Sequence, residues 1–314
     1  MSSIKLFAGN SNRPFAESTA SFLKTQLGQM NISRFADGEV QVEIRDNVRG
    51  AHVFLIQSAC KPVNENYMEL FIILDALKRA SAGEITLVMP YYGYARQDRK
   101  SSPRAPISAK CMADLCSTAG ANRLLVTDLH SPQIQGFFNI PVDNLFAGPT
   151  LAQAWLSNYP DREVVCVSPD AGGMERVRSF AKRVKNSTIA MIDKRRTEKN
   201  KAKAIHLVGD VKGKTAVLVD DMIDTAGTLC EAAGKLLEFG AKEVFAVASH
   251  PVLSATAAER IEEGHLKEVY VTDTIPLSEK AAQCKKIKVI SLAPLMGEAI
   301  SRIFDKKSVS SLFN

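Results

Sequence analysis

Residues 215–228 read TAVLVDDMIDTAGT and combine a short apolar run with three carboxylates and a small, partly hydroxylic end. The apolar run at 216–219 predicts a strand that is buried on both faces, as in the middle of a parallel sheet. Its carboxyl end would deliver Asp220 and Asp221 to the sheet edge at which open α/β folds bind ligands. The stretch therefore predicts a strand, a binding turn and the start of a helix in an α/β protein.

The residues that close this stretch favour a phosphate. They are Thr225, Ala226, Gly227 and Thr228. Small residues at a helix N-terminus let backbone N–H groups surround an anion. Carboxylates repel a phosphate, so we expect Asp220, Asp221 and Asp224 to face the hydroxyls of a ribose or a magnesium ion. A simpler alternative is that Asp224 only caps the helix, but the accompanying carboxylates and the Gly-Thr pair favour a sugar-phosphate site.

Length and composition set broad limits. The 314 residues suit two domains of about 150 residues each. A chain with 46% hydrophobic and 24% charged residues is typical of globular proteins, and a net charge of +6 does not imply nucleic acid. The six cysteines form no C-x-x-C pair, and no apolar run approaches the roughly 20 residues of a membrane helix. We therefore expect a cytoplasmic protein that does not bind membranes.

An internal repeat suggests how the domains arose. Residues 120–130, GANRLLVTDLH, align with residues 240–250, GAKEVFAVASH, at an offset of 120. Each follows a helical pattern closed by glycine, and each ends in histidine shortly before a proline. Chance similarity of two strand ends is the alternative. The repeat predicts two α/β domains with mainly parallel sheets, at 1–147 and 148–293, followed by a C-terminal helix and tail at 294–314.

Hydrophobic periodicity predicts the other elements. Strands are expected at 4–8, 32–35, 40–44, 53–57, 85–90, 164–167 and 188–192. Helices are expected at 14–27, 65–79, 107–119, 150–156 and 174–184. The Asp-Gly pair at 37–38 predicts that the second and third strands form a hairpin.

Two further turns carry residues that could bind a ligand or an ion. Asp128 and His130 stand two residues apart at a strand end, so they can act on one ligand, although a strand-end histidine is often structural. The turn SPDAGG at 168–173 follows a strand and precedes a helix, where backbone donors could face an anion and Asp170 a cation. A plain helix-capping turn is the alternative there.

Two basic stretches need separate interpretations. The segment DKRRTEKNKAK at 193–203 holds six basic residues, which is typical of a solvated loop. A nucleic-acid surface is disfavoured because no aromatic residues are interleaved. The functional alternative is a cationic lid that closes over a triphosphate. The segment GDVKGKT at 209–215 is one residue short of a P-loop and precedes a strand instead of a helix, so we exclude a P-loop.

These motifs carry a family resemblance. Residues 217–228 resemble the phosphoribosyl-diphosphate signature of type I phosphoribosyltransferases, and residues 128–143 resemble, nearly residue for residue, the signature of class I ribose-phosphate diphosphokinases (PRPP synthetases). The resemblance extends over nearly the whole chain. It implies two tandem type I phosphoribosyltransferase-like domains, with ATP on the first and ribose 5-phosphate on the second. It also implies that the C-terminal tail packs on the N-terminal domain.

The resemblance implies an activity and its catalytic residues. The diphosphoryl group of ATP would be transferred to the 1-hydroxyl of ribose 5-phosphate, giving 5-phosphoribosyl 1-diphosphate (PRPP) and AMP for nucleotide, histidine and tryptophan biosynthesis. Lys194 and Arg196 match the family's two transition-state residues. The implied cofactor is Mg²⁺, at Asp128, His130 and Asp170. Asn139 departs from the family's usual Asp, which puts a metal role at that position in doubt.

The resemblance also implies the binding residues. ATP, bound in a neighbouring subunit on the hairpin side, would contact Phe35, Asp37, Gly38, Glu39, Arg96, Gln97, Arg99 and His130. Ribose 5-phosphate would contact Arg196, Asp220, Asp221, Asp224, Thr225, Ala226, Gly227 and Thr228. The regulatory site for inorganic phosphate, as an activator, and ADP would involve Arg49, Arg104, Ser308 and Ser310. Asn47 stands where some members have Ser.

Partners and alternatives complete the expectations. The resemblance implies a homo-oligomer, a hexamer built from dimers, that acts on ATP and ribose 5-phosphate and not on nucleic acid. One alternative is a non-catalytic regulatory homologue, which retention of the matched catalytic residues disfavours. Another is a phosphoribosyltransferase, which shares the turn but needs no ATP hairpin and no second α/β half. A transcription regulator would require a helix-turn-helix, which the sequence lacks.

Overall fold

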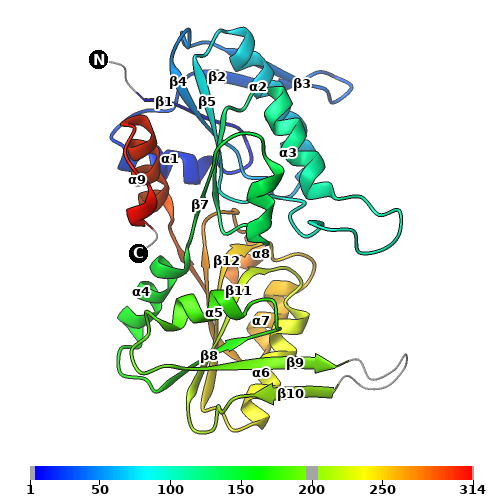
Figure 1. Cartoon of the computed structure of the whole chain (residues 1–314), viewed down its shortest axis with the longest axis vertical. Helices are drawn as coiled ribbons and strands as arrows, with labels where there is room; N and C mark the ends of the chain where they lie inside the picture. Colours follow the sequence, from blue (N-terminus) through cyan, green and yellow to red (C-terminus); the bar gives the residue numbers. More distant parts are fainter. Residues whose placement is uncertain (1–3, 196–203, 313–314) are drawn as a thin grey trace. The chain divides into compact units, whose positions relative to one another are not determined.

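The computed structural model describes residues 4–195 and 204–312, and its chain forms two compact units (Figure 1). Unit 1 comprises the described residues of Met1–Phe146, Thr274–Pro276 and Ser291–Asn314. Unit 2 comprises those of Ala147–Asp273 and Leu277–Ile290. After residue 273 the chain therefore enters unit 1 twice, at 274–276 and from 291 onward.

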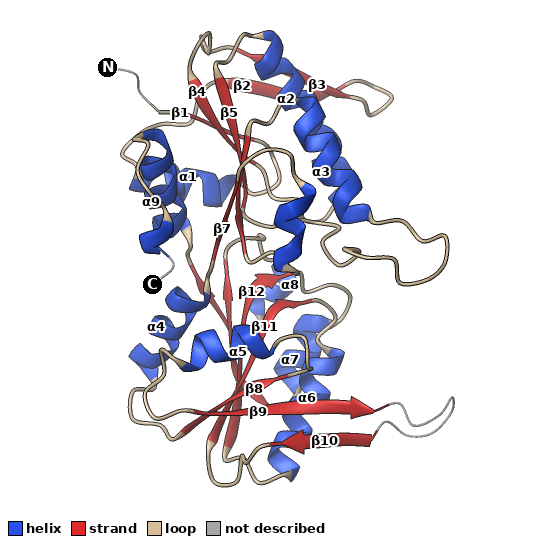
Figure 2. Ribbon diagram, in the orientation of Figure 1, coloured by secondary structure: helices blue, strands red, loops and turns tan. Residues whose placement is uncertain are grey.

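Unit 1 is built on a parallel sheet with the strand order β1-β4-β5-β6-β7. These strands are β1 Lys5–Ala8, β4 His52–Ile56, β5 Glu84–Met89, β6 Arg123–Thr127 and β7 Val142–Leu145. Its helices are α1 Arg13–Phe22, α2 Val63–Arg79, α3 Ser108–Ala119, η1 Pro132–Phe137, α9 Ala293–Phe304 and η2 Ser310–Leu312. The strands are almost entirely buried, because helices cover a parallel sheet on its faces (Figure 2).

A separate hairpin and the C-terminal helix complete unit 1. Strands β2 Met30–Arg34 and β3 Val40–Ile44 pair antiparallel across the turn at 35–39, so the predicted hairpin is confirmed. Helix α9 packs on α1. A side chain at Gly297 of α9 would overlap the ring of Phe22 at the end of α1. Glycine is therefore the residue that lets these two helices approach closely.

Unit 2 is built on a larger sheet with the order β10-β9-β8-β11-β12-β13-β14, parallel except for the antiparallel pair β9 and β10. These strands are β8 Val164–Ser168, β9 Thr188–Arg195, β10 Ala204–Val208, β11 Thr215–Ile223, β12 Glu243–Pro251, β13 Leu266–Thr272 and β14 Ile287–Ile290. Its helices are α4 Gly148–Asn158, α5 Met174–Ala181, α6 Gly227–Glu238, α7 Ala257–Glu263 and α8 Glu279–Gln283. Strand β11 lies mid-sheet, as predicted.

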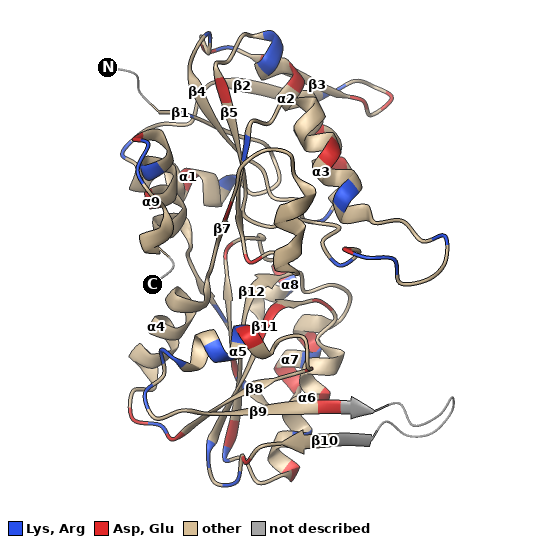
Figure 3. Ribbon diagram, in the orientation of Figure 1, with Lys and Arg blue, Asp and Glu red and all other residues tan. Residues whose placement is uncertain are grey.

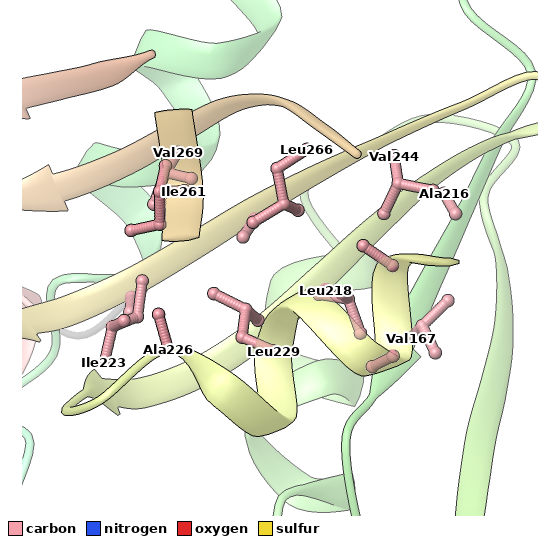
Figure 4. Close-up of a cluster of buried hydrophobic side chains, with 14 of the residues drawn as sticks. Val167, Ala216, Leu218, Ile223, Ala226, Leu229, Val244, Ile261, Leu266 and Val269 are labelled. Carbon is pink, nitrogen blue, oxygen red and sulfur yellow. The ribbon is translucent and has the colours of Figure 1, made fainter. Parts of the chain in front are cut away.

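The core of unit 2 fixes the turn that follows β11. Figure 4 shows the apolar side chains of β11, α6 and β12 packed together. Ile223 at the end of β11, Ala226 in the turn and Leu229 in the first turn of α6 are all buried. The backbone between the strand and the helix is therefore anchored at three points, and it can present its N–H groups in one fixed arrangement.

The predicted repeat corresponds to equivalent structure in the two units. Helix α3 joins the neighbouring parallel strands β5 and β6, and helix α6 joins β11 and β12 in the same way. Each helix is followed by a glycine with positive φ, 136° at Gly120 and 94° at Gly240. The next residue closes the helix in both units: Ala121 N–H donates to the Cys116 carbonyl (3.1 Å), and Ala241 N–H to the Leu236 carbonyl (3.0 Å). The predicted α/β class with parallel sheets flanked by helices is confirmed.

Several element ends differ from the sequence prediction. Helix α1 ends at Phe22 instead of 27, because Lys24 takes a left-handed conformation with φ of 52°. Strand β9 continues to Arg195, because it pairs with β10, which the sequence did not predict. The excluded P-loop segment runs directly into β11, as expected. Among the described residues, none of the helices has the length and apolarity to span a bilayer.

Candidate active site

Asp220 and Asp221 lie inside strand β11, which corrects the prediction that the strand ends before them. The strand continues to Ile223 because β12 also extends this far, pairing Asp220 with Ala248 and Ile223 with Pro251. Asp221 is 3% exposed, and its backbone N–H donates to Oδ1 of Asp220 at 2.9 Å. The two carboxylates are therefore held close together at the edge of the sheet, just before the turn.

Burial and the neighbouring carboxylate raise the pKa of Asp220. Burial is the largest cause, followed by the charge of Asp221, and together they raise the pKa of Asp220 to about 7. Arg176 on α5 acts in the opposite direction. Its Nη1 atom lies 3.5 Å from an oxygen of Asp220 and 3.5 Å from an oxygen of Asp221. Figure 3 shows the acidic end of β11 beside basic residues of α5.

Ser254, a residue of the loop after β12, fixes the position of Asp224. The hydroxyl of Ser254 hydrogen-bonds to Oδ1 of Asp224, and the Ser254 N–H donates to the Asp224 carbonyl at 3.1 Å. The residue that precedes helix α6 is Ala226, and no side chain caps that helix. Asp224 is therefore not the N-cap residue of α6.

The turn itself leaves the N-terminus of α6 open to a ligand. Ala226 takes a left-handed conformation with φ of 57°, which redirects the chain into the helix at Gly227. Nη1 of Arg260 on α7 donates to the Thr225 carbonyl at 2.9 Å and so turns that oxygen toward α7. With no side-chain cap, the first N–H groups of α6 can receive an anion, and the helix dipole favours it. Thr228 contributes a hydroxyl in the same turn.

The sequence left open whether the turn between β8 and α5 is a helix-capping turn, and the structure contains a capping contact there. Oδ1 of Asp170 accepts a hydrogen bond from the N–H of Gly173 at 3.0 Å, and the Ser168 hydroxyl donates to the Asp170 carbonyl at 2.6 Å. Asp170 is nevertheless exposed, so its second oxygen faces solvent. The residue both shapes the turn and remains open to a cation.

In unit 1, Asp128 and His130 follow β6. Asp128 is 7% exposed and takes a positive φ of 39°, and its N–H donates to the Leu145 carbonyl at 2.9 Å. The side chain of Asn144 accepts from the N–H of Leu129 at 3.1 Å. His130 is exposed. Strand β7 thus fixes the backbone that carries Asp128 and His130, the residues that the sequence predicts to bind a metal ion.

The hairpin turn displays the four residues expected to contact ATP: Phe35, Asp37, Gly38 and Glu39. All are exposed, and the Phe35 side chain is 52% exposed. The turn is closed by Gly38 N–H to the Phe35 carbonyl (2.9 Å), and Gly38 has φ of 96°. Arg34 donates to the Gly38 carbonyl at 2.9 Å and pairs with Glu65 of α2 at 2.7 Å. An exposed phenylalanine on a tethered turn is free to stack on a flat ligand.

The other expected ATP residues lie in the segment before α3. Arg96, Gln97 and Arg99 are exposed. The Gln97 carbonyl accepts from Ala109 N–H at 3.2 Å, and its side chain hydrogen-bonds to the Ser108 hydroxyl. This ties the arginine-bearing loop to the start of α3.

The expected regulatory residues lie in three separate segments of unit 1. Arg49 donates to the Ser81 hydroxyl at 3.2 Å. Arg104 takes a left-handed conformation with φ of 65°. Ser308 and Ser310 hydrogen-bond to each other at 3.0 Å between hydroxyls. A regulatory role for these residues stays a prediction.

The two expected catalytic residues fall where β9 meets the undescribed segment. The backbone of Lys194 pairs with Ile205 of β10. The side chain of Lys194 is not described, and Arg196 lies outside the described residues. Lys194 therefore stands within a strand, whereas the sequence placed it in a lid after the strand.

The donors of the expected metal residues suit Mg²⁺, which usually binds one or two carboxylates and completes its shell with water and substrate phosphates. The exposed carboxylate of Asp170 is such a donor. Within residues 4–195 and 204–312, no group of three or more His, Cys, Asp or Glu side chains is arranged to hold a metal alone. The residues thus fit an ion that arrives with a phosphate-bearing substrate.

Sequence reasoning missed three residues that support the site: Arg176, Ser254 and Arg260. Each lies on a different element from the residue it contacts. No motif marks them, because their role depends on which strands and helices become neighbours.

A mid-sheet strand that ends in paired carboxylates and a phosphate-type turn defines a phosphoribosyltransferase-type α/β protein. Residues 4–120 match the model of the N-terminal domain of ribose phosphate pyrophosphokinase, and residues 194–314 match the phosphoribosyl synthetase-associated domain. The chain belongs to the ribose-phosphate pyrophosphokinase family, which confirms the resemblance found in the sequence.

Individual relatives cover the whole chain. The ribose-phosphate pyrophosphokinase of Caldanaerobacter subterraneus subsp. tengcongensis is 55% identical over 311 residues, which are 99% of this chain and 98% of that protein. That of Bacillus caldolyticus is 53% identical over 311 residues, with the same coverage of 99% and 98%. The crystal structure of phosphoribosylpyrophosphate synthetase from Mycobacterium smegmatis matches with a TM-score of 0.92 and 42% identity, over 96% of this chain and 99% of that chain.

Proposed function

We propose that this enzyme transfers the diphosphoryl group of ATP to the 1-hydroxyl of ribose 5-phosphate, giving PRPP and AMP. Full-length relatives at 50–55% identity are named ribose-phosphate pyrophosphokinases. The observation that carries the proposal is the end of β11, where paired carboxylates stand beside an uncapped helix N-terminus. A ligand with an anionic group and several hydroxyls, such as a pentose phosphate, matches that pairing.

In this proposal unit 2 binds the sugar. The N–H groups at the start of α6, with the Thr225 and Thr228 hydroxyls, receive the 5-phosphate. Asp220 and Asp224 accept hydrogen bonds from the ribose hydroxyls, and the buried Asp221 lies behind Asp220. The Ser254 contact fixes Asp224, so little orientation remains to be lost when the sugar binds.

The transfer is an in-line displacement at the β-phosphorus. The 1-hydroxyl oxygen attacks and its proton is released to solvent, while the bond from the β-phosphorus to the bridging oxygen of AMP breaks and AMP leaves. Lys194 and Arg196 stabilise the negative charge that spreads onto the phosphoryl oxygens. Asp170 in unit 2 and, at a separate position, Asp128 with His130 in unit 1 would hold Mg²⁺, which would neutralise phosphate charge when bound. Positioning and electrostatics thus provide most of the catalysis.

Unit 1 binds ATP through the hairpin turn and the loop before α3. Phe35 is available to stack on adenine, and Arg96 and Arg99 can pair with phosphates. We also propose that the chain forms a homo-oligomer, a hexamer built from dimers, and that inorganic phosphate activates it. The six free cysteines agree with the reducing cytoplasm as its compartment.

The alternatives explain less. A phosphoribosyltransferase would use the turn in unit 2 but gives no purpose to unit 1, whose sequence matches the N-terminal domain of ribose phosphate pyrophosphokinase. A non-catalytic homologue is not favoured, because full-length relatives at 50–55% identity are named as enzymes.

The direct test is the reaction itself. Purified protein with ATP, ribose 5-phosphate and Mg²⁺ should form AMP and PRPP in equal amounts, and omission of the sugar phosphate should stop AMP formation. The substitution Asp224→Asn should reduce the rate by at least about tenfold, since it weakens the hydrogen bonds to the sugar. Asp161→Asn, at an exposed position in unit 2, is the matched control. AMP formation that does not require the sugar phosphate would contradict the proposal.

A further inference from the structure

Arg176 contacts both carboxylates of the paired aspartates at the end of β11. Its Nη1 atom lies 3.5 Å from an oxygen of each, although the two residues are neighbours in a strand and their side chains leave the backbone on opposite sides. Asp221 is almost completely buried and the Arg176 side chain is 25% exposed. The guanidinium is thus the bridge between a buried carboxylate and one that borders solvent.

Arg176 lies beside the turn before α5, in which Gly173 approaches Ser168 closely. A Cβ atom at Gly173 would lie 2.8 Å from the Ser168 hydroxyl oxygen and 3.8 Å from Nη1 of Arg176. Gly173 is itself held by Asp170, whose carboxylate accepts its N–H. The turn that carries a proposed metal ligand and the strand that carries the proposed sugar ligands therefore meet at Arg176.

We propose that Arg176 is a positioning residue of the ribose 5-phosphate site, which joins Asp220 to the buried Asp221 and so holds the Asp220 carboxylate in the orientation that accepts the sugar hydroxyls. This inference rests on the proposed function. Without the guanidinium, two carboxylates at this distance would repel each other, and Asp220 would rotate away or take up a proton. A protonated or rotated carboxyl is a poorer acceptor for a hydroxyl donor.

This role predicts that substitution of Arg176 changes the KM for ribose 5-phosphate and not the KM for ATP. Arg176→Gln should raise the KM for ribose 5-phosphate by about tenfold or more, because loss of orientation weakens sugar binding, while the KM for ATP stays within about twofold. Arg176→Lys should restore part of the affinity, because an ammonium keeps the charge but not the planar fork of the guanidinium. Arg178→Gln, two residues along the same helix and exposed, is the matched control and should leave both constants unchanged.

Binding of ribose 5-phosphate alone, followed by calorimetry, gives a readout that does not depend on turnover. The Gln variant should bind the sugar at least about tenfold more weakly than wild type, with the Lys variant between them. A soluble Gln variant with wild-type affinity and KM for the sugar overturns the role of Arg176. If the Gln variant does not fold, the Lys variant decides, since a sugar affinity equal to wild type would likewise overturn it. Failure of wild-type protein to form AMP rejects the proposed function instead.

Discussion

The hydroxyl of Ser254 hydrogen-bonds to the carboxylate of Asp224, which is 30 residues earlier in the chain. Ser254 belongs to the loop after β12, and Asp224 to the turn after β11. The two loops meet because their strands are parallel neighbours that end at the same edge. The turn that ends β11 is therefore supported by the loop after the next strand, and its geometry does not depend on local sequence alone.

Substitution of Ser254 tests this support. Ser254→Ala should raise the KM for ribose 5-phosphate by about three- to tenfold, because the lost hydrogen bond acts on the sugar only through the orientation of Asp224 and the backbone contact remains. The KM for ATP should not change. Ser157→Ala, on the exposed face of α4, is the control. Equal KM values for the sugar in wild type and variant would show that Asp224 needs no such support.

Asp220 makes sugar binding depend on pH. Because burial and Asp221 raise its pKa to about 7, a fraction of the free site is protonated near neutral pH. Sugar hydroxyls prefer the ionised acceptor, so binding lowers the pKa and releases a proton. Affinity for ribose 5-phosphate should therefore fall as pH decreases from 8 to 6.

Calorimetry in two buffers of different ionisation enthalpy measures the proton directly. At pH 6.5 wild-type protein should release protons when ribose 5-phosphate binds, and Asp220→Asn should release fewer. His250 of β12 lies on the same face of the sheet, paired with Met222, and is the neighbouring group to test by His250→Gln. Unchanged proton release in the Asp220 variant would assign the effect to another group.

Gly297 determines how closely α9 approaches α1. Gly297→Val places a side chain against the ring of Phe22 and should destabilise unit 1 by about 1–3 kcal/mol, the usual cost of overpacking. Urea unfolding measures the difference. Gly136→Ala is the control, because a Cβ at that position meets no atom within 4 Å and φ there is not positive. A Val variant as stable as wild type would mean that the Phe22 ring, which is 45% exposed, turns away and that Gly297 does not set the approach of the two helices.

The sequence was sufficient for those parts of the fold that local patterns determine. The apolar run at 216–219 indicated a mid-sheet strand, the Asp-Gly pair indicated the hairpin, and the repeat indicated equivalent strand-helix-strand segments. The extent of β11 could not be predicted, because Asp220 and Asp221 are poor strand formers and are in the strand only through pairing with β12.

The candidate site likewise contains some residues that a local motif identifies and others that only the fold brings together. Its carboxylates and its turn form one continuous motif, so sequence reasoning could name them. Arg176 and Ser254 become part of the site through strand order and helix placement, which no local pattern specifies. Strand β10 was missed for a related reason, since its five residues, AIHLV, are a short run after the basic segment and form a strand through antiparallel pairing with β9.

Lys194 tests the proposed chemistry most directly. If its ammonium stabilises the charge on the transferring phosphoryl oxygens, Lys194→Ala should lower kcat by at least about a hundredfold, because interactions made only in the transition state affect turnover and not ground-state binding. ATP binding by calorimetry should change by less than about threefold. Lys185→Ala, an exposed lysine shortly before β9, controls for loss of one positive charge in the same unit. Near-normal turnover in the Lys194 variant would exclude this residue from the mechanism, whereas equal losses of ATP affinity and turnover would make it a binding residue.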